Sequence, residues 1–143
     1  MFISILITTL VSITAIMISG YILSRILKRN DIADTMWGLG FLIIGVSQVA
    51  SFQELNLKAS LVLIFVAAWS IRLASYVSIR SFNKPEDVRY VNFKKNWKDK
   101  EPINAFFKVY LLQSFLMGII ALTISLIIKA NPSSISPLDF IAV

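Results

Sequence analysis

The chain has 143 residues, of which 57% are hydrophobic and only 15% charged, and its formal net charge is +6. Soluble chains carry about 25% charged residues, so this composition predicts a protein embedded in lipid. Histidine and cysteine are both absent, which excludes disulfide bonds, thiol nucleophiles and imidazole acid–base chemistry, and leaves no His or Cys ligand for zinc or haem. We therefore expect an all-α membrane protein without a metal site.

Four apolar runs are long enough to cross about 30 Å of hydrocarbon. The predicted transmembrane helices, which together form one domain, cover residues 2–23, 33–52, 57–79 and 103–128. The first run lacks a basic start and is longer than the apolar core of a secretory signal, so we interpret it as a retained span. After the fourth run, Pro132 and Pro137 end the helix. Residues 138–143 then indicate the first turn of a fifth span.

The basic residues predict the topology. Segments 25–31 and 80–102 hold most of the lysines and arginines, whereas the turns at 53–58 and 129–137 hold one lysine each. By the positive-inside rule both segments face the cytoplasm, and the N-terminus lies outside the cell membrane. Orientation and anionic headgroups explain these charges, so no nucleic-acid partner is expected. We interpret segment 80–102, which mixes basic and aromatic residues, as amphipathic at headgroup level; the alternative is that it closes over an anionic ligand.

One arginine lies at membrane depth. Arg72 stands eight residues before Arg80, about 12 Å deeper along the third span. Trp69 and Tyr76 fall within the same arc of about 80°. An arginine at this depth costs up to about 3 kcal/mol unless it is paired. Because guanidinium groups bind phosphate and carboxylate, we expect this stripe to hold an anionic cofactor or a structural carboxylate. Snorkelling of Arg72 to the headgroups is the alternative.

Polar and small residues on the second and fourth spans are candidate neighbours of this stripe. Asp34 shares a helix face with Gly38, Gly45 and Gln48. It could pair with an arginine of the third span, complement the helix dipole or take part in binding. The two glycines indicate close helix packing. Gln113 on the fourth span could make an interhelical hydrogen bond or face a binding site.

Several short segments, in this order and spacing, resemble a known family. They are 34–38 (Asp-Thr-Met-Trp-Gly), 69–74 (Trp-Ser-Ile-Arg-Leu-Ala), Arg80, 86–90 (Glu-Asp-Val-Arg-Tyr) and 112–113 (Leu-Gln). From about residue 31 to residue 140 the chain resembles the N-terminal half of a bacterial and archaeal family of uncharacterised membrane proteins related to steroid 5-alpha-reductases.

This resemblance implies a bundle of six or seven transmembrane helices with an NADPH pocket that opens to the cytoplasm. It also implies reduction of an enone in a lipid or steroid-like substrate, and it places Arg80 and Gln113 beside the cofactor. No catalytic residue is assigned, because Tyr76 stands where the family often has a histidine proton donor, although its hydroxyl could substitute. The residues expected to bind or orient the cofactor are Arg72, Arg80, Arg89, Tyr90, Gln113 and Asp34.

The chain ends at Val143, before the histidine-containing stretch that forms much of the cofactor site in the family's second half. We therefore expect an incomplete reductase, inactive alone, with a second polypeptide as a candidate source of the missing half. The alternative is a non-catalytic multi-pass protein, a subunit or assembly factor whose polar residues only hold its helices together. A small transporter is disfavoured because the chain has no inverted repeat.

Overall fold

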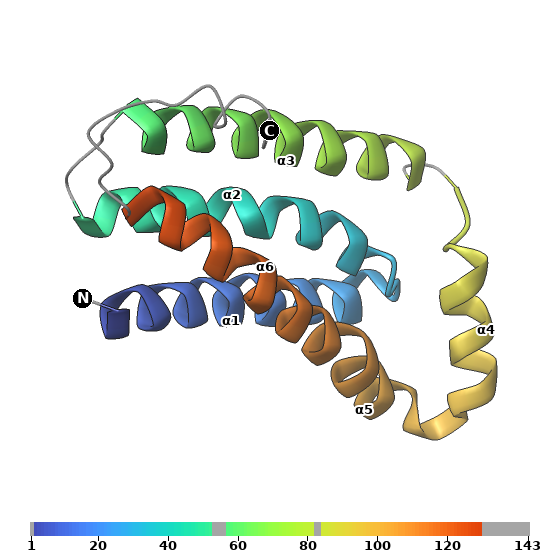
Figure 1. Cartoon of the computed structure of the whole chain (residues 1–143). Coiled ribbons are helices and arrows are strands. Elements are labelled where there is room, and N and C mark those ends of the chain that lie inside the picture. Colours follow the sequence, from blue (N-terminus) through green and yellow to red (C-terminus); the bar gives the residue numbers. More distant parts are fainter. Residues whose placement is uncertain (1, 53–56, 82–83, 130–143) are drawn as a thin grey trace.

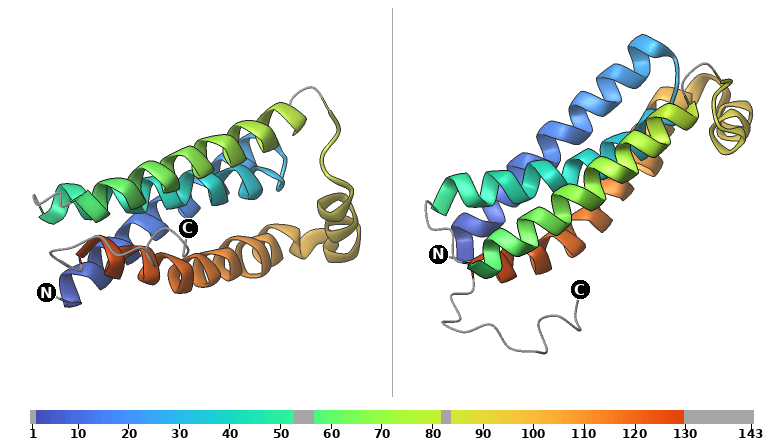
Figure 2. Two further views of the ribbon diagram at one scale, coloured as in Figure 1. Left: turned by 45° about the horizontal axis from the view of Figure 1, so that its top comes forward. Right: turned by 90° about the horizontal axis from the view of Figure 1, so that it is seen from above.

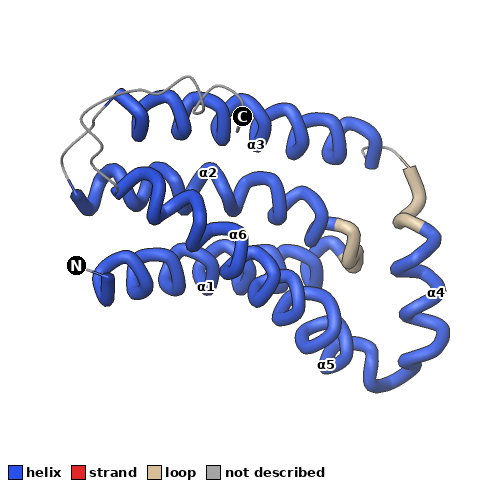
Figure 3. Tube along the Cα trace, in the orientation of Figure 1, coloured by secondary structure: helices blue, strands red, loops and turns tan. Residues whose placement is uncertain are grey.

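The structure is a computed structural model, and it describes residues 2–52, 57–81 and 84–129. Within these ranges every regular element is a helix, which confirms the predicted fold class. The long helices are α1 (Phe2–Leu27), α2 (Ile32–Phe52), α3 (Leu57–Ser81) and α6 (Leu112–Lys129). The shorter elements are α4 (Val88–Trp97), η1 (Lys98–Lys100), α5 (Glu101–Ala105) and η2 (Phe106–Leu111). Figure 3 shows short loops before α2 and before α4 in the described part of the chain, whereas the elements from α4 to α6 follow one another directly.

Four helical stretches are long and apolar enough to cross a membrane, which confirms an integral membrane protein with four spans. Figure 1 shows α2 lying between α1 and α3, while α6 crosses the bundle obliquely. Helix α6 packs against all three of the others. The same arrangement is visible from two further sides in Figure 2.

One end of the bundle gathers the predicted basic segments. We call it the loop end and define it by the α1–α2 connection, residues 28–31, and by residues 84–101, which include α4. Figure 1 shows α4 standing across this end instead of continuing along the bundle. The two basic segments therefore lie at the same end, as the topology prediction requires. Which side of a membrane this end faces stays a prediction.

Helix α1 continues four residues beyond the predicted span and ends in a left-handed turn. Lys28 has a φ of 55°, a conformation that glycine usually supplies at a helix C-terminus. The Arg29 N–H then donates to the Ser24 carbonyl oxygen at 3.0 Å, closing a Schellman-type turn. This turn directs residues 28–31 back toward α2. The predicted fifth span, residues 138–143, lies outside the described residues.

The fourth predicted span contains a widened turn that the sequence does not announce. Residues Phe106–Leu111 form a π-helical segment between α5 and α6. Tyr110 within it is buried, and the Tyr21 ring packs edge-on against it at a centroid distance of 5.5 Å. The Tyr21 hydroxyl also donates to the Pro102 carbonyl oxygen at 3.2 Å. The π turn thus fits the start of the fourth span around an aromatic side chain of α1.

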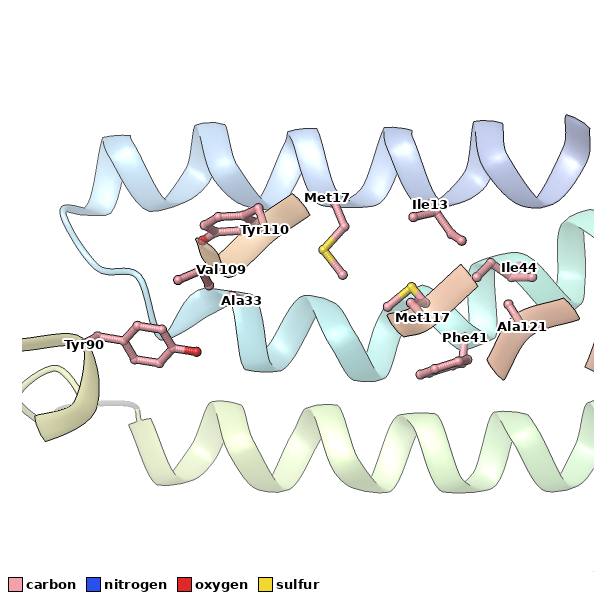
Figure 4. Packing of buried hydrophobic residues seen from close by; sticks show 10 residues of the cluster. All are labelled: Ile13, Met17, Ala33, Phe41, Ile44, Tyr90, Val109, Tyr110, Met117 and Ala121. Atoms are coloured by element: carbon pink, nitrogen blue, oxygen red, sulfur yellow. The ribbon is translucent and has the colours of Figure 1, made fainter. Parts of the chain in front are cut away.

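The hydrophobic core lies between α1, α2 and α6. Figure 4 shows Met17 of α1 and Met117 of α6 extending into the space between these helices, with Phe41 of α2 beside Met117. Tyr90 stands apart at the loop end, where its ring projects from α4 toward the bundle with the hydroxyl leading. The core therefore joins the three inner helices, and Tyr90 attaches α4 to them.

Gly38 brings α2 and α3 into close contact, as its position on the predicted face indicated. A Cβ atom added there would lie 3.1 Å from the Ala74 backbone nitrogen and 3.3 Å from the Ser70 carbonyl oxygen. Backbone atoms of a packed helix have little room to move away. Gly118 of α6 has more space, since an added Cβ would meet only Ile13 Cδ1 at 3.7 Å.

We expect Gly38→Ala to be less stable than Gly118→Ala by about 1–3 kcal/mol in the free energy of unfolding. Both changes gain helix propensity, but only the first forces two helices apart. Reversible unfolding of the purified variants in mixed micelles measures the difference. Equal stabilities would show that the α2–α3 contact is looser than described.

Candidate functional site

The loop end is held by ion pairs that connect segments far apart in the sequence. Arg25 at the end of α1 contacts Glu101 of α5, with 2.6 Å between Nη1 and Oε2. Asn30 is fully buried, donates from Nδ2 to Glu101 Oε1 at 2.6 Å and accepts a hydrogen bond from Arg25. These three side chains close a ring that joins α1, the α1–α2 connection and α5.

Asp31 forms a second connection. Both of its oxygens accept from Arg29, from Nη2 at 2.7 Å and from Nε at 3.1 Å, and Asp31 is only 5% exposed. Its Oδ2 also accepts from the Asp87 backbone N–H at 3.3 Å. Arg29 donates further to the Lys84 carbonyl oxygen at 2.9 Å. Asp31 therefore fixes the approach to α4.

Glu86 forms the third connection. Its Oε1 accepts from the Asn30 backbone N–H at 2.5 Å, and its Oε2 pairs with Lys94 Nζ of α4 at 2.6 Å. Lys94 also donates to the Lys28 carbonyl oxygen at 2.7 Å. Helix α4 is thereby held against the turn that ends α1.

Asp34 of α2 is the point at which α4 meets the bundle core. The Tyr90 hydroxyl donates to its Oδ1 at 2.8 Å, and Arg89 Nη2 donates to its Oδ2 at 2.9 Å. Arg89 also contacts Asp87, with 3.1 Å between Nε and Oδ1. One carboxylate of α2 thus receives two neighbouring side chains of α4.

Asp87 caps α4, since its side chain accepts from the Arg89 backbone N–H at 2.9 Å. The side-chain hydrogen bond from Arg89 is the main cause that holds the pKa of this carboxyl below its ordinary value of 3.8. A lowered pKa means that the carboxylate stabilises the fold above the ordinary pKa, and that this contribution is lost as the pH falls through the folded-state value.

We expect Asp87→Ala to lower the free energy of unfolding by about 1 kcal/mol at pH 7, the usual cost of removing an N-cap. The difference from the unsubstituted chain should shrink as the pH falls below the ordinary carboxyl pKa of 3.8 and through the lower folded-state value. Unfolding measured in micelles from pH 7 to about pH 2 tests both statements. A difference that stays constant over this whole range would show that Asp87 acts through contacts other than its charge.

Beneath α4 lies a cavity of about 490 Å³, a volume typical of small-molecule sites. Helices α2, α3, α4 and α6 all contribute to its wall, which is partly charged and partly apolar. The cavity is lined by Asp31, Asp34, Trp37, Leu73, Val77, Arg80, Ser81, Asp87, Arg89, Gln113 and Leu116.

Most of the charges in this wall are already paired. Arg29 compensates Asp31, and Arg89 contacts both Asp34 and Asp87. Arg80, in contrast, is exposed and makes no hydrogen bond or ion pair within the described ranges, although its charge helps to lower the pKa of Asp87. The unpaired guanidinium of Arg80 therefore faces a cavity whose acidic side chains all have partners.

A second cavity of about 370 Å³ adjoins the first. It shares Asp31, Arg80, Ser81 and Asp87 with the larger cavity, and it adds Lys84 to the wall. Arg80 thus stands between two spaces. This placement suits a ligand that carries more than one anionic group, because one guanidinium can donate from several nitrogens.

Gln113 contributes an unsatisfied acceptor to the larger cavity. Its Oε1 atom is buried and has no hydrogen-bond partner among the described residues. A buried acceptor without a donor costs about 1–3 kcal/mol. A ligand that offers an N–H or O–H group at this position would remove that cost.

The six residues predicted to bind or orient a cofactor are only partly brought together. Asp34, Arg80, Arg89 and Gln113 line the larger cavity, and Tyr90 lies next to it through its bond to Asp34. Arg72 does not line either cavity described here.

The suggested pairing of Asp34 with an arginine of the third span is not found within the described ranges. Thr35 lies opposite Ser78, and Gly38 lies opposite Ala74, so Asp34 is level with about residue 79. Arg72 is therefore roughly 10 Å farther along the helix, beyond the reach of this carboxylate. Asp34 pairs with Arg89 of α4 instead.

Sequence reasoning did not select the other seven residues of the cavity wall, which are Asp31, Trp37, Leu73, Val77, Ser81, Asp87 and Leu116. Asp31 and Asp87 lie in short connections, where carboxylates ordinarily face water. A weak signal for both was available, because each stands within three residues of a selected side chain. The hydrogen bond from the Asp87 backbone N–H to the Asp31 carboxylate spans 56 positions of the sequence and has no local signature.

Comparison with known proteins gives one match. A family model described as a protein of unknown function, DUF1295, matches residues 20–143. No curated protein and no solved structure matches the chain.

Proposed function

We propose that this chain, which belongs to the DUF1295 family of proteins of unknown function, carries the NADPH-binding cavity of a membrane reductase related to steroid 5-alpha-reductases. One observation carries the proposal: the unpaired guanidinium of Arg80 and the unsatisfied Oε1 of Gln113 face the same cavity. An anion that also bears a hydrogen-bond donor satisfies both groups, and a nicotinamide dinucleotide has phosphates, hydroxyls and a carboxamide.

The residues present fit such a cofactor. The three carboxylates of the wall are balanced by Arg29, Arg89 and Arg80 together, and Arg80 is the member of this set that makes no ion pair within the described ranges. Lys84 adds a second cation in the adjoining cavity. Trp37 supplies a flat aromatic surface in the same wall, suited to contact with a planar ring.

When bound, NADPH supplies a hydride for reduction of an enone in a lipid or steroid-like substrate. The side chains described here bind and orient. Arg80 holds an anionic group, Gln113 accepts from a donor, and Asp34 holds Tyr90 and Arg89 of α4 beside the cavity.

The test is equilibrium binding of NADPH to the purified chain in lipid nanodiscs. Saturable binding that inorganic salt weakens is expected, because the contact is partly electrostatic. Adding a polypeptide that supplies further helices, where one is found, should tighten it. If NADPH binds neither to the chain alone nor to the chain with the added polypeptide, the reductase proposal is overturned.

A non-catalytic role as a subunit or assembly factor is the second candidate. The observation that favours it is the pairing of Asp31, Asp34, Glu86 and Glu101, which hold the loop end together without any ligand. A chain of this kind would assemble with its partner in the same way in the presence and absence of NADPH, and would not bind the cofactor.

A further inference from the structure

One face of α3 differs from the other exposed faces of the bundle. Phe65, Trp69, Arg72, Tyr76 and Ile79 project within a narrow arc of this helix, and all five are exposed. Within the described ranges, Arg72 and Tyr76 make no hydrogen bond and no ion pair. We call these five residues the α3 stripe.

The exposed faces of α1 and α6 are of another kind. On α1 the large exposed side chains include Leu10, Val11 and Ile18, and on α6 they include Phe115 and Ile119. Such aliphatic and phenylalanine surfaces suit contact with lipid acyl chains. The α3 stripe, in contrast, presents a guanidinium and a phenol one helical turn apart, and both groups are hydrogen-bond donors.

The position of Arg72 along α3 makes an unpaired charge costly. Arg72 lies about 12 Å along the axis from Arg80, which stands at the loop end of α3. A charged side chain at membrane depth ordinarily faces the interior of a bundle and pairs with another group. Few residues of α3 are fully buried within the described part of this chain. The stripe therefore requires an anionic acceptor that the described residues do not supply.

A second copy of the chain does not provide that acceptor from its described residues. The acidic residues within those ranges all lie in the loop end or, as Asp34 does, in the first turn of α2 beside it. Two copies inserted in the same direction place these carboxylates at the same depth as each other, about 10 Å or more from Arg72. A parallel pair of chains would thus leave both arginines unpaired.

We propose that the α3 stripe is the docking surface for a transmembrane helix of another polypeptide, and that this helix carries an aspartate or glutamate at the depth of Arg72. Arg72 donates to the carboxylate, and Tyr76 donates to it from one turn away. Trp69 and Phe65 pack against the partner helix on the side away from the loop end. This inference does not depend on whether the cavity binds NADPH.

The experiment uses the absence of cysteine from the chain. A single cysteine at Ser75, an exposed position beside the stripe, carries a benzophenone label in native membranes, and irradiation captures what lies against it. Ile18→Cys is the matched control, since Gly20 lies opposite Met36 and places Ile18 at a similar depth on the exposed face of α1.

The expected result is a protein adduct at position 75 and lipid adducts alone at position 18. The captured peptide should be a transmembrane segment with an Asp or Glu, and Arg72→Leu should reduce its yield at least tenfold. Exchanging the charges, with Arg72→Asp in this chain and arginine in place of the partner's carboxylate, should restore the adduct.

Four outcomes would overturn the proposal. They are lipid adducts alone at position 75, an adduct to a second copy, an adduct within the same chain, or a protein adduct that Arg72→Leu leaves unchanged. Glu54→Gln and Asp139→Asn test whether a carboxylate of this chain outside the described residues is the partner of Arg72. Loss of the protein adduct in either variant would assign Arg72 a partner in its own chain and would likewise contradict the inference.

Discussion

Replacing Arg80 with glutamine is expected to weaken NADPH binding by roughly tenfold to hundredfold, because a hydrogen bond to a charged group contributes about 1.5–3 kcal/mol. Arg80 makes no ion pair in the described part of the chain. Because its removal leaves no carboxylate without an ion-pair partner, the fold should keep its stability. Titration of NADPH into the variant in nanodiscs measures the loss, and unfolding of the same sample verifies the fold.

Arg72→Gln is the matched control, because Arg72 lies two helical turns away on the same helix and lines neither cavity. This variant should bind NADPH as the unsubstituted chain does. Equal binding by Arg80→Gln and the unsubstituted chain would exclude Arg80 from the site. An equal loss in both variants would indicate a non-specific charge effect and would remove the assignment of this cavity.

Truncation of Glu101 to alanine is expected to have the largest effect on stability, lowering the free energy of unfolding by about 2–3 kcal/mol. Glu101 accepts from both Arg25 and Asn30, and Asn30 is fully buried. Removing the carboxylate leaves Arg25 without its ion-pair partner and leaves the Asn30 amide without an acceptor. Reversible unfolding in mixed micelles gives the measurement.

Asp99→Ala serves as the control for Glu101→Ala. Asp99 is exposed, lies two residues away and makes no ion pair with the residues that the structure describes, so its loss should change stability by less than about 0.5 kcal/mol. If both variants unfold alike, the ring of Arg25, Asn30 and Glu101 does not hold α1 to α5. The loop end would then be less firmly packed than its contacts indicate.

The spans were predictable because lipid imposes a single requirement, a helix of about 20 apolar residues. The ends of the spans were less predictable. Lys28 occupies a left-handed position that glycine would have signalled, and α1 therefore continues past the predicted boundary. The π turn at Phe106–Leu111 depends on Tyr21 packing from another helix, which no local pattern in the fourth span reports.

For the candidate site, the presence of polar side chains within predicted spans was informative. Polar side chains such as Asp34 and Gln113 are costly in a span, and both line the cavity. The signal did not identify partners. Asp34 receives Tyr90 and Arg89 because α4 folds back across the loop end, and that reversal arises from the caps and loops around residues 84–87.

Arg72 and Arg80 show that two residues on one predicted helix face can belong to different surfaces. Both belong to one predicted stripe, but α3 ends at Ser81, so Arg80 reaches the loop-end cavities while Arg72 stays exposed on the helix. An arc of about 80° is wide enough to serve two surfaces. Assigning the two arginines to separate surfaces required the positions of α2, α4 and α6.

The central claim, a ligand cavity beneath α4, is tested most directly by protection of a cysteine placed in its wall. Ser81 lines both cavities, and the chain has no cysteine of its own, so Ser81→Cys offers one thiol to a maleimide. Lys95→Cys, on the exposed side of α4, is the reference. NADPH at saturation should slow labelling at position 81 at least tenfold and leave position 95 unchanged. Equal labelling rates at position 81 with and without NADPH would contradict the claim.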